Sequence, residues 1–207
     1  MTYETIRQQA YEANMKIPEN HLALYTWGNV SAFDKDKGVF AIKPSGVPYP
    51  ELTPESMVII DLDGNKVDGS MNPSSDTPTH AILYKKFGME MGAEIGGIIH
   101  THSTYAVSWA QAVRSVPLFG TTHADHIQKA IPCTPYLSKE AVESDYEKET
   151  GLLIVKHFAD LGLNPSEVNM VLCGGHGPFA WGKNAEKQFT TEQYLKKSAK
   201  WPLILLH

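Results

Sequence analysis

An apolar run at residues 95–99 (IGGII) ends directly on His100-Thr101-His102, and this junction constrains the fold more than any other part of the chain. A short apolar run without helical periodicity predicts a buried β-strand. Side chains alternate between the two faces of a strand, so His100 and His102 project from the same side. The pattern therefore predicts a buried strand that brings two imidazoles close enough to bind one metal ion.

A third histidine, His176, stands far downstream in a glycine-rich segment, residues 174–178. A histidine from such a loop would complete a site of three imidazoles with one position open for a substrate, as in catalytic zinc centres. Three neutral ligands leave the ion its full positive charge, so that it acts as a Lewis acid. The alternative is three unrelated histidines that each make ordinary hydrogen bonds. Cys173 is expected to be a core thiol, although it stands close enough in sequence to approach the ion.

The composition excludes several classes of function. The chain has a net charge of −5, and only Arg7 and Arg114 are arginines among its 18 basic residues, so it offers no basic stripe to nucleic acid. No apolar run is long enough to span a membrane, and residues 1–4 carry no basic start. Its two cysteines form no Cys-x-x-Cys pair. We therefore expect one cytoplasmic domain over residues 1–207 that binds neither nucleic acid nor membrane.

Helical and strand-like segments interleave along the chain. The hydrophobic pattern predicts helices over residues 3–16, 76–87 and 146–161, a helix that begins after Ser103, and strands over residues 22–32, 39–42, 57–62, 96–102, 168–172 and 179–181. Asp63-Gly64 predicts a hairpin. Such hairpins make much of the sheet antiparallel, with helices covering its faces, and the expected class is α/β.

Two short segments have the composition of an anion site. Lys43, Ser45 and Gly46 lie in the first, and Ser74 and Ser75 lie in the second, directly before a predicted helix. Hydroxyls, backbone N–H groups and the positive end of a helix dipole favour a phosphate, and Lys43 adds a full positive charge. Taken alone, each segment also fits an ordinary turn, because Ser, Gly and Pro are common turn residues.

Two aspartates stand near these motifs. Asp76 lies where a helix is predicted to begin, so it fits a helix cap, a metal ligand or a carboxylate that orients a metal-bound histidine, and these roles are compatible. Asp125 lies in a segment without clear periodicity, residues 121–126, where it would serve as a catalytic acid or base. A solvated loop is the alternative for this segment, and His126 is a further candidate metal ligand.

Six segments stand in order along the chain: TWGNVS at 26–31, IKPSGV at 42–47, PSSDTPTH at 73–80, HTHS at 100–103, GTTHAD at 120–125 and HGPFAWG at 176–182. With these segments in this order, the chain resembles the class II aldolase family over residues 5–186, and in particular its L-ribulose-5-phosphate 4-epimerase branch. The segment Ser74-Ser75-Asp76, rather than the glutamate-containing version typical of fuculose-phosphate aldolases, favours the epimerase branch.

The resemblance implies a three-layer α/β/α fold around a largely antiparallel sheet, assembled as a homotetramer with sites between subunits. It implies that Zn²⁺, or another divalent metal, is held by His100, His102 and His176, with Asp76 as a further ligand. The sugar-phosphate substrate, and chiefly its phosphate, would be bound by Asn29, Lys43, Ser45, Gly46, Ser74 and Ser75, and Thr121 and Glu147 would line the same site. Asp125 would be the catalytic acid or base.

The implied activity is the epimerisation of L-ribulose 5-phosphate to D-xylulose 5-phosphate. Because C4 carries no acidic proton, the C3–C4 bond is broken in a retro-aldol step, the aldehyde rotates, and the bond re-forms with inverted configuration. The metal stabilises the enediolate while the phosphate grip retains the aldehyde. The alternatives are a class II aldolase of the fuculose- or rhamnulose-phosphate type, a member of the fold without catalytic activity, and a Schiff-base mechanism through Lys43.

The resemblance ends after Glu186. Family members continue with a helix and a tail that carries a His, an Arg and a proton-transferring Tyr, whereas residues 187–207 contain no such motif. This atypical end is interpreted as a truncation, or as a frame shift over the codons of residues 196–201. If the family's tail is absent, we expect a folded, metal-binding protein with strongly reduced epimerase activity.

Overall fold

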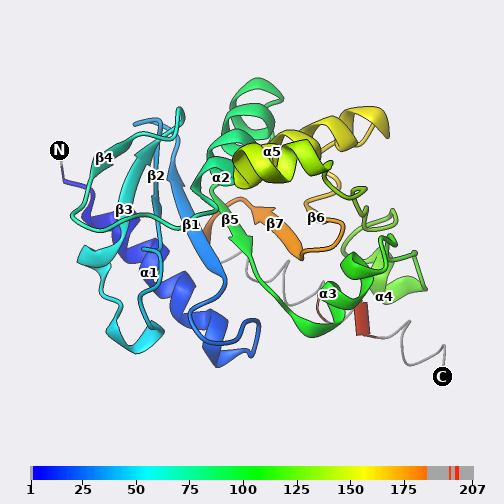
Figure 1. The fold of residues 1–207 in the computed structure, drawn as a ribbon, viewed down its shortest axis with the longest axis horizontal. Helices are drawn as coiled ribbons and strands as arrows, with labels where there is room; N and C mark the ends of the chain where they lie inside the picture. The colour runs from blue at the N-terminus through cyan, green and yellow to red at the C-terminus, as the bar shows by residue number, and fades with distance from the viewer. Residues whose placement is uncertain (1, 186–195, 197–198, 201–207) are drawn as a thin grey trace.

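The strand that ends on His100 lies inside one antiparallel sheet. The structure, a computed structural model, describes residues 2–185, 196 and 199–200. Over these residues the sheet has seven strands in the order β4-β3-β2-β1-β5-β7-β6, and each neighbouring pair runs antiparallel (Figure 1). The strands are β1 (Asn29–Asp34), β2 (Val39–Ile42), β3 (Val58–Asp61), β4 (Lys66–Asp68), β5 (Gly97–His100), β6 (Met170–Leu172) and β7 (Pro178–Gly182). The predicted antiparallel sheet is confirmed.

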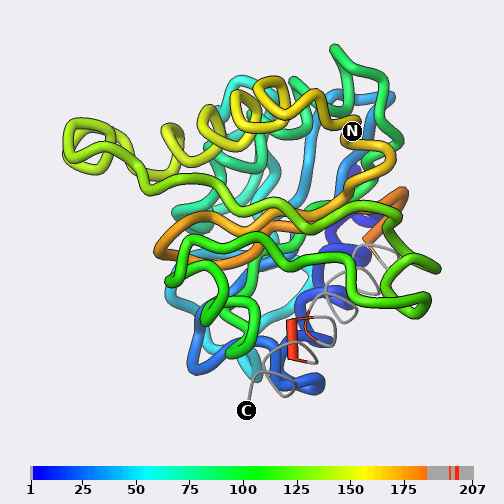
Figure 2. Tube along the Cα trace, turned by 90° about the vertical axis from the view of Figure 1, so that its right-hand side faces the viewer, coloured from blue at the N-terminus to red at the C-terminus, as the bar shows by residue number. Residues whose placement is uncertain are grey.

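Helices cover both faces of this sheet. They are α1 (Glu4–Glu19), α2 (Thr77–Leu83), α3 (Thr104–Gln111), α4 (Thr121–Ala124) and α5 (Lys139–Asp160), with the short helical turns η1 (Tyr49–Glu51) and η2 (Pro54–Ser56) and a π-helical segment, η3 (Tyr84–Glu90). Figure 2 shows α5 (yellow) on one side of the sheet and α1 (blue) on the other, and α2 packs against α5. The predicted three-layer α/β/α arrangement is thus observed. Among the described residues, no helix is both long and apolar enough to cross a membrane.

One predicted strand starts too early. The hydrophobic pattern places it from residue 22, but β1 begins only at Asn29. His21 and Tyr25 both adopt left-handed conformations with φ 52°, and Gly28 follows with φ 79°. These residues curl the chain, so the apolar side chains before β1 belong to a turn rather than to a strand.

Two helix predictions and the irregular segment predicted at residues 121–126 also need correction. The helix predicted from residue 146 already begins at Lys139, and a kink at Asp145 (φ −146°, ψ 79°) joins its two parts. The helix predicted over residues 76–87 passes from α2 into the wider π-helical η3. Residues 121–126, predicted to lack a regular element, contain the four-residue helix α4. Helices this short leave no periodic pattern in the sequence.

A buried polar chain docks α2 and η3 on β1. The hydroxyl oxygen of Ser31 lies 2.7 Å from Nδ1 of His80 and 2.7 Å from the hydroxyl of Tyr84, and the Tyr84 ring stacks on Phe33 with 4.5 Å between centroids. Ser31, His80 and Tyr84 are all buried. Burying a polar group is costly unless it is hydrogen-bonded, so these hydrogen bonds fix how α2 and η3 are positioned on β1.

Replacing Tyr84 by Phe tests this docking. We expect the free energy of unfolding to fall by about 1–2 kcal/mol, because Ser31 loses a buried hydrogen-bond partner while the ring packing remains. Urea denaturation measures the change. Tyr136→Phe is the matched control, since Tyr136 is exposed and its hydroxyl donates to the carbonyl of Gln111, and its effect should stay below about 0.5 kcal/mol. Equal losses in the two variants would contradict the docking role.

Candidate metal centre and anion pocket

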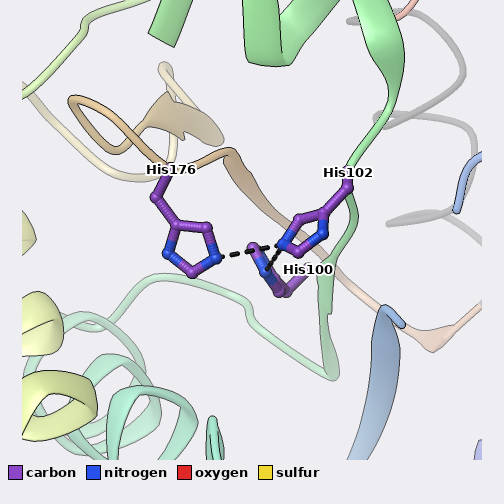
Figure 3. Close-up of side chains that lie close together, drawn as sticks. All are labelled: His100, His102 and His176. Carbon is purple, nitrogen blue, oxygen red and sulfur yellow. Dashed lines mark hydrogen bonds between the residues drawn. The ribbon is translucent and has the colours of Figure 1, made fainter. Parts of the chain in front are cut away.

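Three imidazoles converge at the carboxyl end of β5. His100 is the last residue of that strand, which was predicted to extend to His102 but ends two residues earlier. His102 therefore lies in the connection that follows β5, and His176 comes from the turn before β7. The Nε2 atoms of His100 and His102 are 3.1 Å apart, and those of His102 and His176 are 3.0 Å apart (Figure 3). Ligand atoms of the three rings lie within 4.8 Å of one another. In the described part of the chain this is the cluster that could hold a metal ion, and Cys173 and His126 do not belong to it.

The donor chemistry of the three rings fits a divalent metal. Burial lowers the pKa of His100 and of His176 to about 3, so both rings are neutral. Nδ1 of His100 lies 2.9 Å from the carbonyl oxygen of Pro178, which can only accept a hydrogen bond. That nitrogen therefore carries the ring hydrogen, and Nε2 presents a lone pair to the other two rings. Neutral imidazole nitrogens in this orientation suit Zn²⁺ and related divalent ions.

A pocket of about 200 Å³ opens beside the imidazoles. Its walls bring together most of the residues that the sequence predicts for the site: His100, His102, His176, Asp76, Asn29, Lys43, Ser45, Gly46, Ser74, Ser75 and Glu147. These residues come from strand ends, loops and one helix that lie far apart in the sequence. The fold thus places the candidate metal ligands and the candidate anion-binding residues around one space.

Lys43 is a buried cation in this pocket. Its ammonium lies 3.1 Å from the carbonyl oxygen of Thr26, 3.3 Å from that of Pro44, and 5.1 Å from the centre of the Tyr49 ring. No carboxylate of the described residues pairs with it, and burial lowers its pKa from 10.5 to about 8. Burying a cation among neutral groups is costly. A negatively charged ligand in the pocket would offset that cost.

The two predicted anion-binding segments form one wall of the pocket. The backbone N–H of Ser45 donates to the carbonyl oxygen of Asn72 at 3.0 Å, and that of Ser74 donates to the carbonyl oxygen of Lys43 at 2.9 Å. The backbone N–H groups of Gly46 and Ser75 find no acceptor among the described residues. Gly46 also adopts φ 71°, a conformation that favours glycine. Unused N–H donors and hydroxyls therefore accompany the Lys43 ammonium, as an anion site requires.

Asn29 and Asp76 connect this wall to the metal centre. Asn29 pairs with His100 across β1 and β5, and its Nδ2 donates to Oδ2 of Asp76 at 2.6 Å. Its Oδ1 is buried and has no hydrogen-bond partner among the described residues, which leaves it available to a ligand hydroxyl. Asp76 occupies the N-cap position of α2 without a side-chain capping bond. Its carboxylate lies outside the three-histidine cluster, and its role as a metal ligand stays a prediction.

Thr121 and Asp125 do not line this pocket. Thr121 begins α4, and Asp125 is the C-cap residue of the same helix. Their predicted roles at the site remain predictions. The interpretation of the atypical tail falls on residues outside those that the structure describes, apart from residues 196 and 199–200.

Two of the pocket residues that the sequence-based assignment missed contact the imidazoles. Trp27 packs its ring edge against His102, with 5.5 Å between centroids, and the hydroxyl of Tyr146 lies 2.7 Å from Nδ1 of His176. Burial raises the pKa of Tyr146 to about 12, so the hydroxyl keeps its hydrogen. Trp27 stands inside one of the six ordered segments, which was a usable signal. For Tyr146 the only signal was its position next to Glu147.

Known proteins are similar to this chain in sequence and in fold. The family profile described as "Class II Aldolase and Adducin N-terminal domain" matches residues 8–203. The chain is 42% identical to "L-ribulose-5-phosphate 4-epimerase UlaF" of Salmonella paratyphi C (strain RKS4594), over 97% of this chain and 85% of that protein. A solved L-fuculose 1-phosphate aldolase superimposes with a TM-score of 0.77 at 27% identity, covering 99% of this chain and 88% of that one. The sugar-phosphate aldolase of Thermotoga maritima shares the fold, with a TM-score of 0.74 at 19% identity over 98% and 95% of the two chains.

We expect phosphate-ester binding to depend on pH through Lys43. The ammonium is charged below its pKa of about 8 and neutral above it, so affinity for glycerol phosphate should fall as the pH rises through this value. Since a phosphate ester is already largely dianionic above about pH 7, the loss reports the lysine. Lys43→Met should weaken binding at pH 7 by about 10- to 100-fold and abolish the pH dependence.

Isothermal titration calorimetry measures both effects. Lys85→Met is the matched control, because Lys85 is an exposed lysine outside the pocket that pairs with Asp63. It should leave affinity and pH dependence unchanged. If Lys43→Met keeps the wild-type pH profile, Lys43 is not the group that binds the phosphate.

Proposed function

The chain belongs to the class II aldolase and adducin N-terminal domain family, and from this membership we propose that it is a metal-dependent 4-epimerase that converts L-ribulose 5-phosphate to D-xylulose 5-phosphate. One observation carries the proposal: a three-imidazole cluster and a buried lysine face the same pocket in a chain closely related to an L-ribulose-5-phosphate 4-epimerase. A sugar phosphate needs both parts, because its phosphate and its carbonyl oxygen must be bound at the same time.

The phosphate of the substrate is assigned to the wall that contains Lys43. The ammonium and the unused N–H groups of Gly46 and Ser75 supply donors, and the hydroxyls of Ser45 and Ser74 lie on the same segments. Charge-assisted hydrogen bonds of this kind are short and strong. They would hold the phosphate-bearing fragment in the pocket throughout the reaction.

We assign Zn²⁺ to the three imidazoles; when bound, it supplies a Lewis acid that polarises the substrate's carbonyl oxygen. Epimerisation at C4 requires the C3–C4 bond to break, because C4 carries no acidic hydrogen. The resulting aldehyde fragment must turn about its own axis before the bond re-forms. The pocket wall that contains Lys43 binds the phosphate and not the aldehyde group. The aldehyde group can therefore rotate while the fragment stays bound.

Two proton transfers accompany this bond cleavage and re-formation. The hydroxyl on C4 loses its proton as the bond breaks, and the new aldehyde oxygen regains one as the bond re-forms. We assign this proton to the carboxylate of Asp125. Asn29, whose buried Oδ1 has no partner among the described residues, would accept a hydrogen bond from a substrate hydroxyl.

Asp125 can serve this role only if it reaches a pocket other than the one its own chain forms. We propose that the protein is a homotetramer in which Thr121 and Asp125 of one subunit complete the pocket of its neighbour. The absence of both residues from the pocket of their own chain supports this arrangement. Closed rings of identical subunits readily build such shared sites.

The second candidate function is an aldolase that releases its two fragments. The likeness to a solved L-fuculose 1-phosphate aldolase favours it, because that enzyme shares the fold over nearly the whole chain. Both reactions begin with the same bond cleavage. They differ in whether the aldehyde is retained, so free aldehyde in the reaction mixture distinguishes them.

We expect purified protein to form D-xylulose 5-phosphate from L-ribulose 5-phosphate without releasing free aldehyde. A chelator should abolish turnover, and added Zn²⁺ should restore it, because the Lewis acid is then returned. A coupled assay for D-xylulose 5-phosphate, combined with metal analysis, measures both. Turnover that persists in metal-free protein would refute the proposal, and stoichiometric free aldehyde would favour the aldolase.

Mixed oligomers test the shared site. Asp125→Asn and His102→Ala should each be inactive alone. When the two variants are co-expressed, about a quarter of the wild-type rate should return. In a random mixture each site receives an intact His102 from half of the chains and an intact Asp125 from the other half, so about one site in four has both. A site built by one chain would recover no activity. Mixing each variant with itself provides the background rate.

A further inference from the structure

We propose that Tyr146 is a positioning residue for the metal centre, whose hydroxyl accepts a hydrogen bond from Nδ1 of His176 and so holds that ring with Nε2 toward the other two imidazoles. The inference deepens the proposed function and rests on it, since it assumes that the three histidines bind a metal ion. Neither the ordered sequence segments nor the predicted ligand set includes Tyr146. Its role follows from its contacts alone.

The direction of the hydrogen bond follows from the chemistry of imidazole. Oη of Tyr146 lies 2.7 Å from Nδ1 of His176, and Nε2 of the same ring lies 3.0 Å from Nε2 of His102. A neutral imidazole carries one N–H, so an Nε2 that donates its lone pair to a metal leaves the hydrogen on Nδ1. Tyr146 then accepts that hydrogen. Removing the hydroxyl would leave a half-buried N–H without a partner and the ring free to turn.

Each of the three rings is held by a different contact. Nδ1 of His100 donates to the carbonyl oxygen of Pro178, and the rings of His102 and Trp27 form a T-shaped pair. His176 lies between two glycines, and its preceding residue, Gly175, adopts φ 80°. The main chain around His176 thus carries no side chain that would confine the ring. Tyr146 supplies the hydrogen bond that the loop itself lacks.

The backbone of α5 places this hydroxyl with little freedom. The kink at Asp145 ends the first helical part, and Tyr146 follows directly, with Oγ1 of Thr150 donating to its carbonyl oxygen at 2.8 Å. One turn further on, α5 approaches α2 so closely that a Cβ on Gly151 would lie 3.0 Å from Cδ1 of Ile82. The kink and this close packing together fix where Tyr146 enters the pocket.

Zinc affinity of the Tyr146→Phe variant tests the inference. The ring and its packing remain, and only the acceptor is lost. We expect zinc binding, measured by competition with a chromophoric chelator, to weaken about 10- to 100-fold, as is typical when the partner of a metal-bound histidine is removed. The visible spectrum of the Co²⁺-substituted variant should also change, because the ligand geometry becomes looser.

Tyr84→Phe is the matched control. It too removes a buried, hydrogen-bonded tyrosine hydroxyl, but the hydroxyl of Tyr84 bonds to Ser31 rather than to any of the three imidazoles. Its zinc affinity should stay within about twofold of the wild type. A general loss of stability would weaken zinc binding in both variants, whereas a positioning role affects Tyr146→Phe alone.

The possible outcomes separate the inference from the proposed function. If wild-type protein binds no Zn²⁺, the metal-dependent function itself fails. If the wild type binds Zn²⁺ and Tyr146→Phe binds it equally well with the same Co²⁺ spectrum, the positioning role is wrong and the function stands. Should the variant not fold, a ¹H–¹⁵N spectrum of zinc-loaded wild type decides. A slowly exchanging Nδ1 hydrogen on His176 supports the inference, and a rapidly exchanging one overturns it.

Discussion

The pairing of β5 with a strand on either side is the constraint on which the site depends. His100 pairs with Asn29 of β1 and with Phe179 of β7, and the Phe179 ring stacks on the imidazole with 4.4 Å between centroids. Because side chains alternate along a strand, a slip of one residue would turn both His100 and Asn29 away from the pocket. The register of an apolar strand therefore positions the first candidate metal ligand, and the loops that follow β5 and precede β7 bring the other two candidates.

The pocket contains buried polar groups that lower the stability of the folded protein as long as they have no partner. Lys43 is buried, and no carboxylate of the described residues pairs with its ammonium. Oδ1 of Asn29 is also buried, and it has no hydrogen-bond partner among the described residues. Such groups reduce stability unless a ligand satisfies them, and a ligand that binds only the folded state returns the stability on binding. The apolar strands and the Ser31–His80–Tyr84 hydrogen bonds supply stability elsewhere, so the pocket can keep polar groups that are unsatisfied until a ligand binds.

Much of the site was predictable because its residues lie in short, ordered patterns. The strand before His100, the spacing of His102 and the composition around Lys43 each carry a local physical signal, and the structure brings them to one pocket. Tyr146 carries no such signal, because its role depends on a kink in α5 and on a loop thirty residues away. The start of β1 was also missed, since left-handed residues before it break a strand whose hydrophobic pattern continues.

The sequence by itself determined the types of chemical group and the class of fold. Hairpin signals between the apolar segments favoured an antiparallel sheet covered by helices, because a tight turn joins antiparallel strands. The His100-Thr101-His102 pattern placed two imidazoles next to each other in the chain, although β5 ends at His100 and strand alternation alone does not place His102. Only the tertiary structure decided how distant groups meet. It showed that Tyr146 contacts His176 and that Asp125 lies outside the pocket of its own chain. It also showed that no carboxylate of the described residues pairs with Lys43. Those facts depend on packing between elements, which no local pattern encodes.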